Sequence, residues 1–201
     1  KFCLDNNIKL IYSATSASLG NKGNDKNLSP YAFTKAKNLE LLENLKKWFN
    51  FKYEVIYFYN VYGANQISKG SMATVIGIFE RCYKNKKPMP VVKPGNQTRS
   101  FLYIEECITG LQKIMASNID QPVNLGSERM ISINDLAQLI GQIAGKNTLE
   151  INNVDGPIGV MGRTSHNNLI EELLDWRPSE DLEYGLKHTY AWIKDKVDER
   201  T

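Results

Sequence analysis

The sequence predicts an α/β fold in which parallel strands alternate with helices. Residues 8–14 and 53–61 are short, rich in isoleucine, valine and tyrosine, and bounded by polar residues, as buried strands are. Residues 30–49 lie between them and are long enough for a helix. A strand, a helix and a second strand in this order predict a right-handed parallel crossover. With 201 residues, the chain can bury one large core or two small ones.

The sequence indicates where the helix between these strands begins and ends. Ser29 is suited to be its N-cap, and Pro30 follows at the first helical position, where the missing N–H of proline costs nothing. We expect this helix to end at Phe49. Residues 121–127 are a weaker strand candidate. Further helices are expected in five segments: 71–85, 103–117, 132–145 with Ser132 as its cap, 165–176 and 182–197.

These elements are typical of a Rossmann-like, doubly wound parallel sheet, but one part of that pattern is missing. Such a sheet carries a glycine-rich phosphate loop after its first strand and an acidic residue about 20 positions further on. The chain contains no such G-x-x-G-x-x-G segment. We therefore expect the C-terminal part of a Rossmann-like doubly wound parallel sheet.

Composition excludes several function classes. The 25 basic and 22 acidic residues are scattered and give a formal net charge of +3, so we expect no nucleic-acid partner. Cys3, Cys82 and Cys107 are widely spaced and follow no metal-ligand pattern, and His166 and His188 add none, so no metal site is expected. No apolar run reaches the roughly 18 residues of a membrane span, and the amino terminus has no signal-peptide layout. A cytoplasmic location is the expectation.

Tyr31 and Lys35 are the first candidates for chemistry. Residues four apart on a helix project from one face, so both side chains can meet one ligand. A free phenol is too weakly acidic to be an efficient base at neutral pH, but a nearby ammonium and a cationic nicotinamide ring favour the phenolate. Tyr31 can then exchange a proton with a substrate hydroxyl. The preceding strand end offers further hydroxyls: Ser13, Thr15, Ser16 and Ser18.

Six segments in order decide between this chemistry and a chance tyrosine–lysine pair. They read "LIYSATSASLG", "SPYAFTK", "VIYFYNVYGANQ", "QTRSFLYIEECITGL", "PVNLGSERMISINDLAQLI" and "GRTSHNNLIEELLDWRPS". Together they resemble the extended short-chain dehydrogenase/reductase family, and within it the NAD-dependent nucleotide-sugar epimerases and dehydratases. The segment after "VIYFY" resembles UDP-glucose 4-epimerase-like proteins, and the C-terminal segments resemble GDP-mannose 3,5-epimerases.

The resemblance implies roles for eight residues. Tyr31 matches the acid/base tyrosine of the family, Lys35 the lysine at the nicotinamide ribose, and Thr15 the residue that bonds the sugar hydroxyl. The expected cofactor contacts are Ser13, Tyr31, Lys35 and Phe58, and the expected substrate contacts are Asn60, Arg99 and Arg163.

The resemblance also implies domains, ligands and partners. Residues 1–66 and 101–126 are expected to form the later part of the dinucleotide-binding domain, and residues 67–100 and 127–201 a small α/β domain for the nucleotide sugar. NAD is the expected cofactor, with NADP as the alternative, and a GDP- or UDP-hexose is the expected substrate. A homodimer is expected through the Tyr31–Phe49 helix or the edge of the sheet. The chain looks like part of a larger fold and is expected to be inactive alone.

The residues after Thr15 limit the types of reaction that the family resemblance allows. Ser16 and Ala17 stand where 4,6-dehydratases carry an acidic pair, and Ala17 also replaces the glutamate of decarboxylating members. This favours a 4-epimerase that oxidises the hexose transiently at C4. A 3,5-epimerase is the alternative, although Ala17 and Thr74 stand in for its acid/base cysteine and lysine. A sugar-nucleotide dehydratase and a non-catalytic nucleotide-binding module also stay open.

Overall fold

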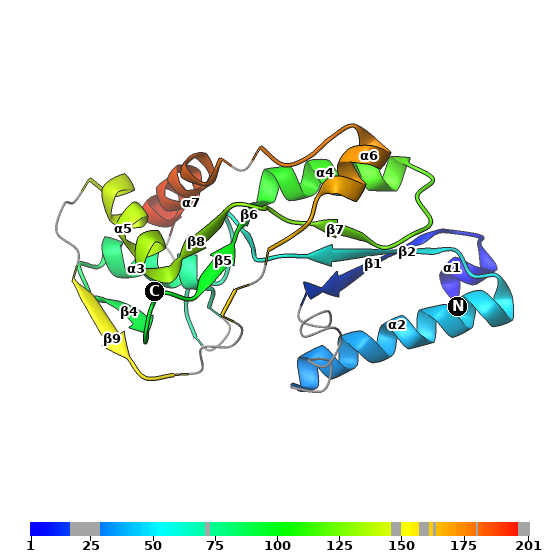
Figure 1. Ribbon diagram of the computed structural model, residues 1–201, viewed down its shortest axis with the longest axis horizontal. Helices are drawn as coiled ribbons and strands as arrows, with labels where there is room; N and C mark the ends of the chain where they lie inside the picture. Colours follow the sequence, from blue (N-terminus) through cyan, green and yellow to red (C-terminus); the bar gives the residue numbers. More distant parts are fainter. Residues whose placement is uncertain are drawn as a thin grey trace. The chain divides into compact units, whose positions relative to one another are not determined.

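The computed structural model describes two compact units, which alternate along the chain (Figure 1). Unit 1 comprises Lys1–Tyr59, Thr109–Gly126 and Ser165–Arg177, and unit 2 comprises Asn60–Ile108, Ser127–Thr164 and Pro178–Thr201. The described residues are 1–16, 29–70, 73–145, 150–156, 161–162, 164–179 and 181–196. Because these units are defined by packing, the predicted assignment of cofactor and substrate to separate domains stays a prediction.

Unit 1 is built on a three-stranded parallel sheet in the order β1-β2-β7. Helix α2 joins β1 to β2, so the predicted strand–helix–strand crossover between parallel strands is confirmed. Figure 1 shows α2 on one face of the sheet and α6 on the other. The elements of unit 1 are α1 (Phe2–Asp5), β1 (Leu10–Thr15), α2 (Pro30–Phe49), β2 (Tyr53–Phe58), β7 (Val123–Leu125) and α6 (Asn168–Leu174), together with most of α4 (Ile104–Ala116).

The ends of α2 are those predicted from the sequence. The Ser29 hydroxyl accepts a hydrogen bond from the Ala32 N–H at 3.1 Å, and Pro30 is the first helical residue. At the other end, Asn50 adopts a left-handed conformation with φ of 50° and terminates the helix. The position of Tyr31 and Lys35 on the first turns of α2 is thereby fixed.

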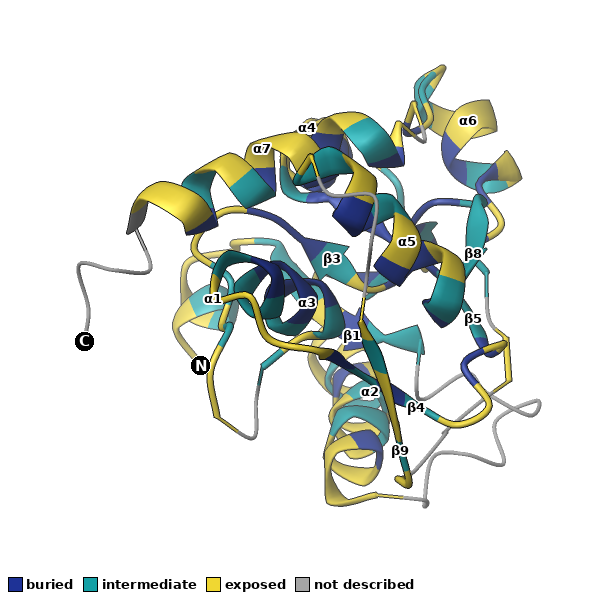
Figure 2. Ribbon diagram, turned by 90° about the vertical axis from the view of Figure 1, so that its left-hand side faces the viewer, coloured by how far each residue is buried: buried dark blue, intermediate teal, exposed yellow. Residues whose placement is uncertain are grey.

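Unit 2 packs three helices against small sheets. These elements are β3 (Val61–Tyr62), α3 (Val75–Lys84), β4 (Met89–Val92), β5 (Thr98–Ser100), β6 (Leu102–Tyr103), β8 (Met130–Ser132), α5 (Ile133–Ile143), β9 (Ile151–Val154) and α7 (Leu182–Lys196). β3 pairs with β6 and β4 with β9 in parallel, while β5 pairs with β8 antiparallel. The core is fully buried at Ile76, Phe79, Met89, Leu136, Ile140 and Leu186. Figure 2 shows buried residues concentrated on α3 and α5 and few on α2.

Two helices begin three or four residues later than predicted. α3 begins at Val75 and not near residue 71, since Thr74 is its N-cap. α6 begins at Asn168 and not at Ser165, because the residues before it make one local and one tertiary hydrogen bond. The Ser165 hydroxyl donates to Asn167 at 2.8 Å, and the Asn167 side chain donates to the Gly126 carbonyl at 2.8 Å. α5 begins at its predicted cap, Ser132. No helix in the described part of the chain has both the length and the apolar character that crossing a bilayer requires.

Candidate functional site

The carboxyl ends of β1 and β2 bring three of the predicted residues to one edge of the unit 1 sheet. The strands pair in register, with Ser13 beside Ile56 and Thr15 beside Phe58. In parallel α/β sheets this edge is where ligands bind. Ser13 is exposed, while Thr15 and Phe58 are half-buried. The sheet therefore presents hydroxyl groups and an aromatic ring at its carboxyl edge.

Lys35 is held against this edge. Its ammonium donates a hydrogen bond to the main-chain carbonyl of Ser13 at 2.7 Å. The same ammonium lies 5.2 Å from the centre of the Tyr12 ring, within the range of a cation–π interaction. The Tyr12 hydroxyl in turn donates to the Lys35 main-chain carbonyl at 3.4 Å. Lys35 thus places a positive charge beside the end of β1.

Tyr31 lies one turn before Lys35 on α2 and is open to solvent. Its side chain is 57% exposed, and its main-chain carbonyl accepts a hydrogen bond from the Thr34 hydroxyl at 3.0 Å. An exposed phenol can be reached by a ligand. The structure therefore brings Ser13 and Lys35 into contact, with Thr15 and Phe58 on the adjoining strand ends and Tyr31 on the same helix as Lys35.

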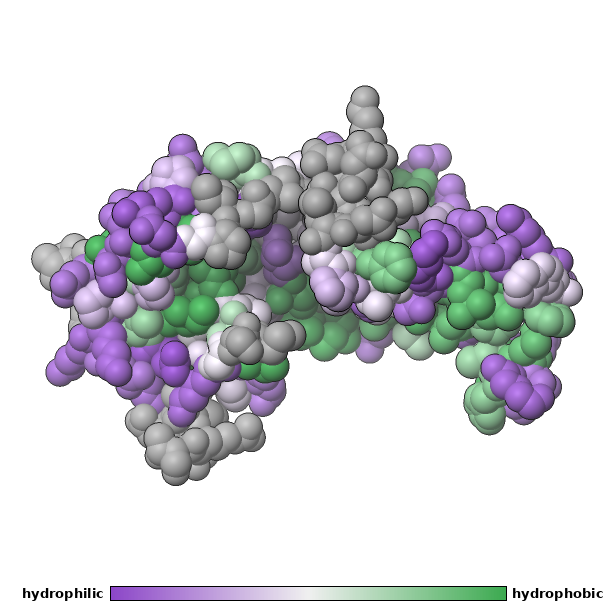
Figure 3. Space-filling view, turned by 90° about the horizontal axis from the view of Figure 1, so that it is seen from below, coloured by the Kyte–Doolittle hydropathy of each residue, from purple (hydrophilic) through white to green (hydrophobic). Residues whose placement is uncertain are grey.

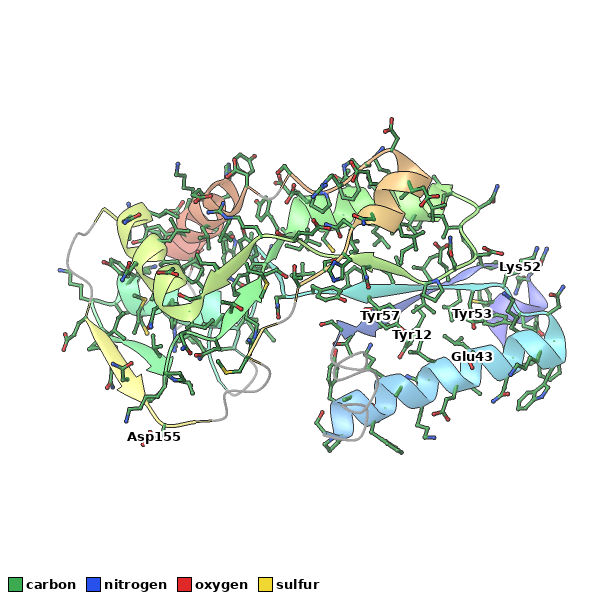
Figure 4. The ribbon with its side chains drawn as sticks, in the orientation of Figure 1. Tyr12, Glu43, Lys52, Tyr53, Tyr57 and Asp155 are labelled. Atoms are coloured by element: carbon green, nitrogen blue, oxygen red, sulfur yellow. The ribbon has the colours of Figure 1, made fainter. Side chains whose placement is uncertain are left out.

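A layer of tyrosines separates the sheet from α2. Tyr12, Tyr53 and Tyr57 lie between them, and Glu43 of α2 points toward these rings (Figure 4). Burial, followed by the Glu43 carboxylate, raises the pKa of both Tyr53 and Tyr57. These phenols therefore stay protonated near neutral pH and act as hydrogen-bonding and packing groups. Sequence reasoning missed Tyr12, although the alternation of β1 puts it on the same face as the buried Ala14.

Unit 2 contains a cavity of about 230 Å³ that is lined by Asn60. Asn60 has a left-handed conformation with φ of 36°, and its amide donates to the Ser100 carbonyl at 2.8 Å. The other lining residues are Val61, Tyr62, Thr74, Val75, Ile76 and Phe101. The amino end of α3, capped by Thr74, therefore borders the cavity together with an asparagine.

Arg99 is two residues before Phe101, which lines this cavity. It is half-buried on β5 opposite Ile131, and its guanidinium donates to the Thr98 carbonyl at 2.7 Å. Arg163 lies outside the described residues. The chain on either side of it is anchored within unit 2: the Met161 carbonyl accepts from the Thr98 N–H at 2.8 Å, and the Thr164 hydroxyl donates to the Glu128 carbonyl at 3.1 Å. Asn60 is thus bonded to the residue that follows Arg99, in the same unit.

A family comparison fits these observations. The model of the NAD dependent epimerase/dehydratase family matches residues 1–126, which is more than half of the chain. The chain belongs to this family. The family and the α/β fold predicted from the sequence are therefore confirmed.

Individual relatives point to nucleotide-sugar epimerases. GDP-mannose 3,5-epimerase of Arabidopsis thaliana is 35% identical over 169 residues, which cover 84% of this chain and 45% of that protein. The solved UDP-N-acetylglucosamine 4-epimerase of Methanobrevibacter ruminantium M1 superposes with a TM-score of 0.88 at 24% identity, over 96% of this chain and 66% of that one. UDP-glucuronic acid 4-epimerase of Bacillus cereus, solved with UDP-glucuronic acid and NAD, gives 0.83 at 26% identity, over 93% and 62%.

The chain spans less than half of the length of the plant relative and about two thirds of each solved chain. The matched part of the family model includes the tyrosine–lysine helix and both strands at the candidate site. What the relatives bind and convert is a property of those longer proteins.

Proposed function

We propose that the protein containing this chain is an NAD-dependent nucleotide-sugar epimerase that inverts C4 of a hexose by transient oxidation. The observation that carries the proposal is the position of the Lys35 ammonium, bonded to Ser13 at the carboxyl edge of the sheet, one turn from the exposed Tyr31. The two side chains start from adjacent turns of α2, and Lys35 is bonded to the end of β1, the part of such a sheet where ligands bind.

Tyr31 removes the proton from the C4 hydroxyl of the sugar and returns it after the ketone has turned in the pocket. Lys35, one turn further along α2, can meet the same ligand from the same face of the helix. Thr15, at the end of β1, donates or accepts a hydrogen bond at the same oxygen and orients it. NAD, when bound, would supply the hydride acceptor and donor for C4.

The residues at the sheet edge fit the nicotinamide end of NAD. An ammonium and a hydroxyl, on Lys35 and Ser13, match the hydroxyl groups of a ribose, and the half-buried Phe58 offers an apolar surface to a ring. The sequence holds no glycine-rich phosphate loop. This chain therefore supplies the contacts to one end of the cofactor, and turnover belongs to the longer protein.

The cavity of unit 2 suits the diphosphate of a GDP- or UDP-hexose. The amino end of a helix attracts anions through its main-chain N–H groups and its dipole, and α3 opens at this cavity. Asn60 lines the same cavity. Arg99 and Arg163 supply guanidinium groups, whose planar fork donates paired hydrogen bonds to phosphate. NAD and the nucleotide sugar thus use different residues of the chain.

A 3,5-epimerase is the second candidate, favoured by the 35% identity to the plant GDP-mannose enzyme. Such a reaction needs an acid and a base that act on carbon. Thr74 instead caps α3, accepting from the Gly77 N–H at 3.4 Å, and donates to Gln66 at 3.0 Å. A threonine hydroxyl in this role is no acid or base near neutral pH. The C4 reaction needs no such pair.

The second partner in the proposal is another copy of the chain. The exposed face of α2 carries Phe33, Leu41 and Trp48, which are 45%, 50% and 64% exposed. Figure 3, seen from the side of α2, shows apolar and polar side chains interspersed along it. Two such helices, packed face to face, bury these apolar groups. Lys37 and Glu40 lie on the same face, where they form an ion pair at 2.7 Å, and the Lys37 ammonium is 5.8 Å from the centre of the Phe33 ring.

Proton exchange with solvent separates the two reactions. The full-length protein is incubated with NAD and either UDP-glucose or GDP-mannose in deuterium oxide, and the sugars are followed by NMR. A C4 epimerase gives an inverted C4 without deuterium, because the same hydrogen is removed and returned. A 3,5-epimerase inserts deuterium at C3 and C5. Deuterium at those carbons, or nucleotide binding without any conversion, overturns the proposal.

A further inference from the structure

We propose that Tyr12 is a positioning residue for Lys35, which it holds at both ends so that the ammonium stays at the edge of the sheet. The role in catalysis rests on the proposed function, whereas the contact itself does not. Lysine has a long, flexible side chain that loses up to about 2 kcal/mol of rotamer entropy when it is fixed. Such a side chain keeps one position only where several contacts hold it.

Three contacts from two consecutive residues of β1 fix Lys35. The Tyr12 hydroxyl donates to the main-chain carbonyl of Lys35 at 3.4 Å. The ring of Tyr12 lies 5.2 Å from the ammonium, which also donates to the Ser13 carbonyl at 2.7 Å. One side chain thus contacts the backbone of the lysine and its charged tip. The tip is thereby directed to the carboxyl end of β1.

Tyr12 is itself well placed to act as a rigid support. It lies in the middle of β1, where it pairs with Val55 of β2, and it is half-buried. Figure 4 shows Tyr12 beside Tyr57 in the tyrosine layer between the sheet and α2. Tyr12 adds to the raised pKa of Tyr57, after burial, Glu43 and Tyr59, which agrees with this closeness. A ring wedged between a strand and a helix has little freedom to move.

Lys37 provides an internal comparison on the same helix. Its ammonium pairs with Glu40 at 2.7 Å and lies 5.8 Å from the Phe33 ring, so these contacts are made within α2. Lys35 instead reaches from α2 to the sheet. A loss of the Tyr12 ring therefore changes the surroundings of Lys35 and leaves those of Lys37 unchanged.

Lysine reactivity tests the contact on this chain without turnover. Acetic anhydride must reach the side-chain nitrogen of a lysine, so the Ser13 carbonyl and the Tyr12 ring, which contact this nitrogen in Lys35, slow its acetylation. Mass spectrometry is used to follow the rates at Lys35 and Lys37. We expect Tyr12→Leu to speed the acetylation of Lys35 about fivefold and Tyr12→Phe, which keeps the ring, less than twofold. An unchanged Lys35 rate in a folded Tyr12→Leu chain overturns the proposal.

A measurement on the wild-type chain covers the case in which Tyr12→Leu does not fold. In lysine-labelled protein, the methylene protons next to the Lys35 ammonium are assigned through their loss in Lys35→Arg. The neighbouring ring shifts them upfield of the other lysines. Resonances at the usual lysine position contradict the proposed contact.

In the full-length enzyme, Tyr12→Leu lowers kcat about tenfold, moves the acid limb of the pH–rate profile to higher pH and leaves KM unchanged. Tyr12→Phe restores most of kcat. If Tyr12→Leu changes KM together with kcat and leaves the pH–rate profile where it is in the wild type, Tyr12 has only a structural role. If the wild-type enzyme converts no nucleotide sugar, the proposed function fails, while the reactivity of Lys35 still decides the role of Tyr12.

Discussion

Helix α2 of unit 1 and helix α3 of unit 2 differ in how they use their surfaces. α2 has 20 residues, of which only Ala32 and Leu42 are buried, whereas α3 has 10 residues, of which five are buried. α3 contributes Ile76 and Phe79 to the core of its unit. α2 instead holds Lys35 at the sheet edge and leaves Tyr31, Phe33, Leu41 and Trp48 at the surface.

This difference indicates that the two helices have different roles: α3 stabilises the core of unit 2, whereas α2 exposes most of its surface. A helix that builds a core needs apolar residues at the helical period, and α3 has them. The exposed aromatic residues of α2 agree with the roles that we propose for it, at a ligand and against a second copy of the chain. Substitutions on α3 should therefore act on stability, and substitutions on α2 should act on association and catalysis.

Glu80 gives the most direct test of the expectation that substitutions on α3 change stability. It is completely buried, and neither carboxyl oxygen has a hydrogen-bond partner among the described residues. Burial raises the pKa of Glu80 from 4.5 to about 9. The folded chain therefore keeps the proton in a pH range where the unfolded chain releases it. The contribution of the protonated Glu80 to the free energy of unfolding is fully present below pH 4.5 and is lost as the pH rises toward 9.

We expect Glu80→Gln, which keeps the shape and cannot ionise, to abolish this pH dependence. The difference in unfolding free energy between the variant and the wild type should grow by about 1 kcal/mol per pH unit between roughly pH 5 and pH 8. Urea unfolding at several pH values measures it. Glu40→Gln on the exposed face of α2 is the control and should give a nearly flat difference. Equal slopes for the two variants would contradict a buried, protonated Glu80.

Trp48 tests the α2 side with a smaller expected effect. Trp48→Glu puts a charge into the face that we propose to pack against a second copy. The dissociation constant of the dimer should therefore rise at least about tenfold. Sedimentation velocity over a range of concentrations measures it, with Met115→Glu as the matched control because Met115 of α4 is also exposed, at 56%. A wild-type chain that stays monomeric at all concentrations removes this part of the proposal.

The sequence was sufficient to predict those elements whose signals are local. Ser29 and Pro30 gave the start of α2, and Ser132 gave the start of α5. The pairs β4 with β9 and β5 with β8 were not predicted, because each strand is only three or four residues long and its partner lies far along the chain. Pro90 inside β4 also weakens its strand signal.

The candidate site divides in the same way. Tyr31, Lys35 and Thr15 stand out through their spacing and order in the sequence. The bond from Lys35 to Ser13 does not, because a main-chain carbonyl acceptor leaves no mark on residue type. Tyr12 was missed for a related reason, since its contact with Lys35 depends on how α2 seats against β1.

The central claim is that Tyr31 is the acid and base of the reaction, and its replacement by phenylalanine is the most direct measurement. In the full-length protein with NAD and the nucleotide sugar that it converts, Tyr31→Phe should lower kcat by about a hundredfold or more, while KM changes little. Tyr184→Phe removes another exposed phenol, on α7, and should leave kcat unchanged. A Tyr31→Phe enzyme with the kcat of the wild type would contradict the proposed role of Tyr31.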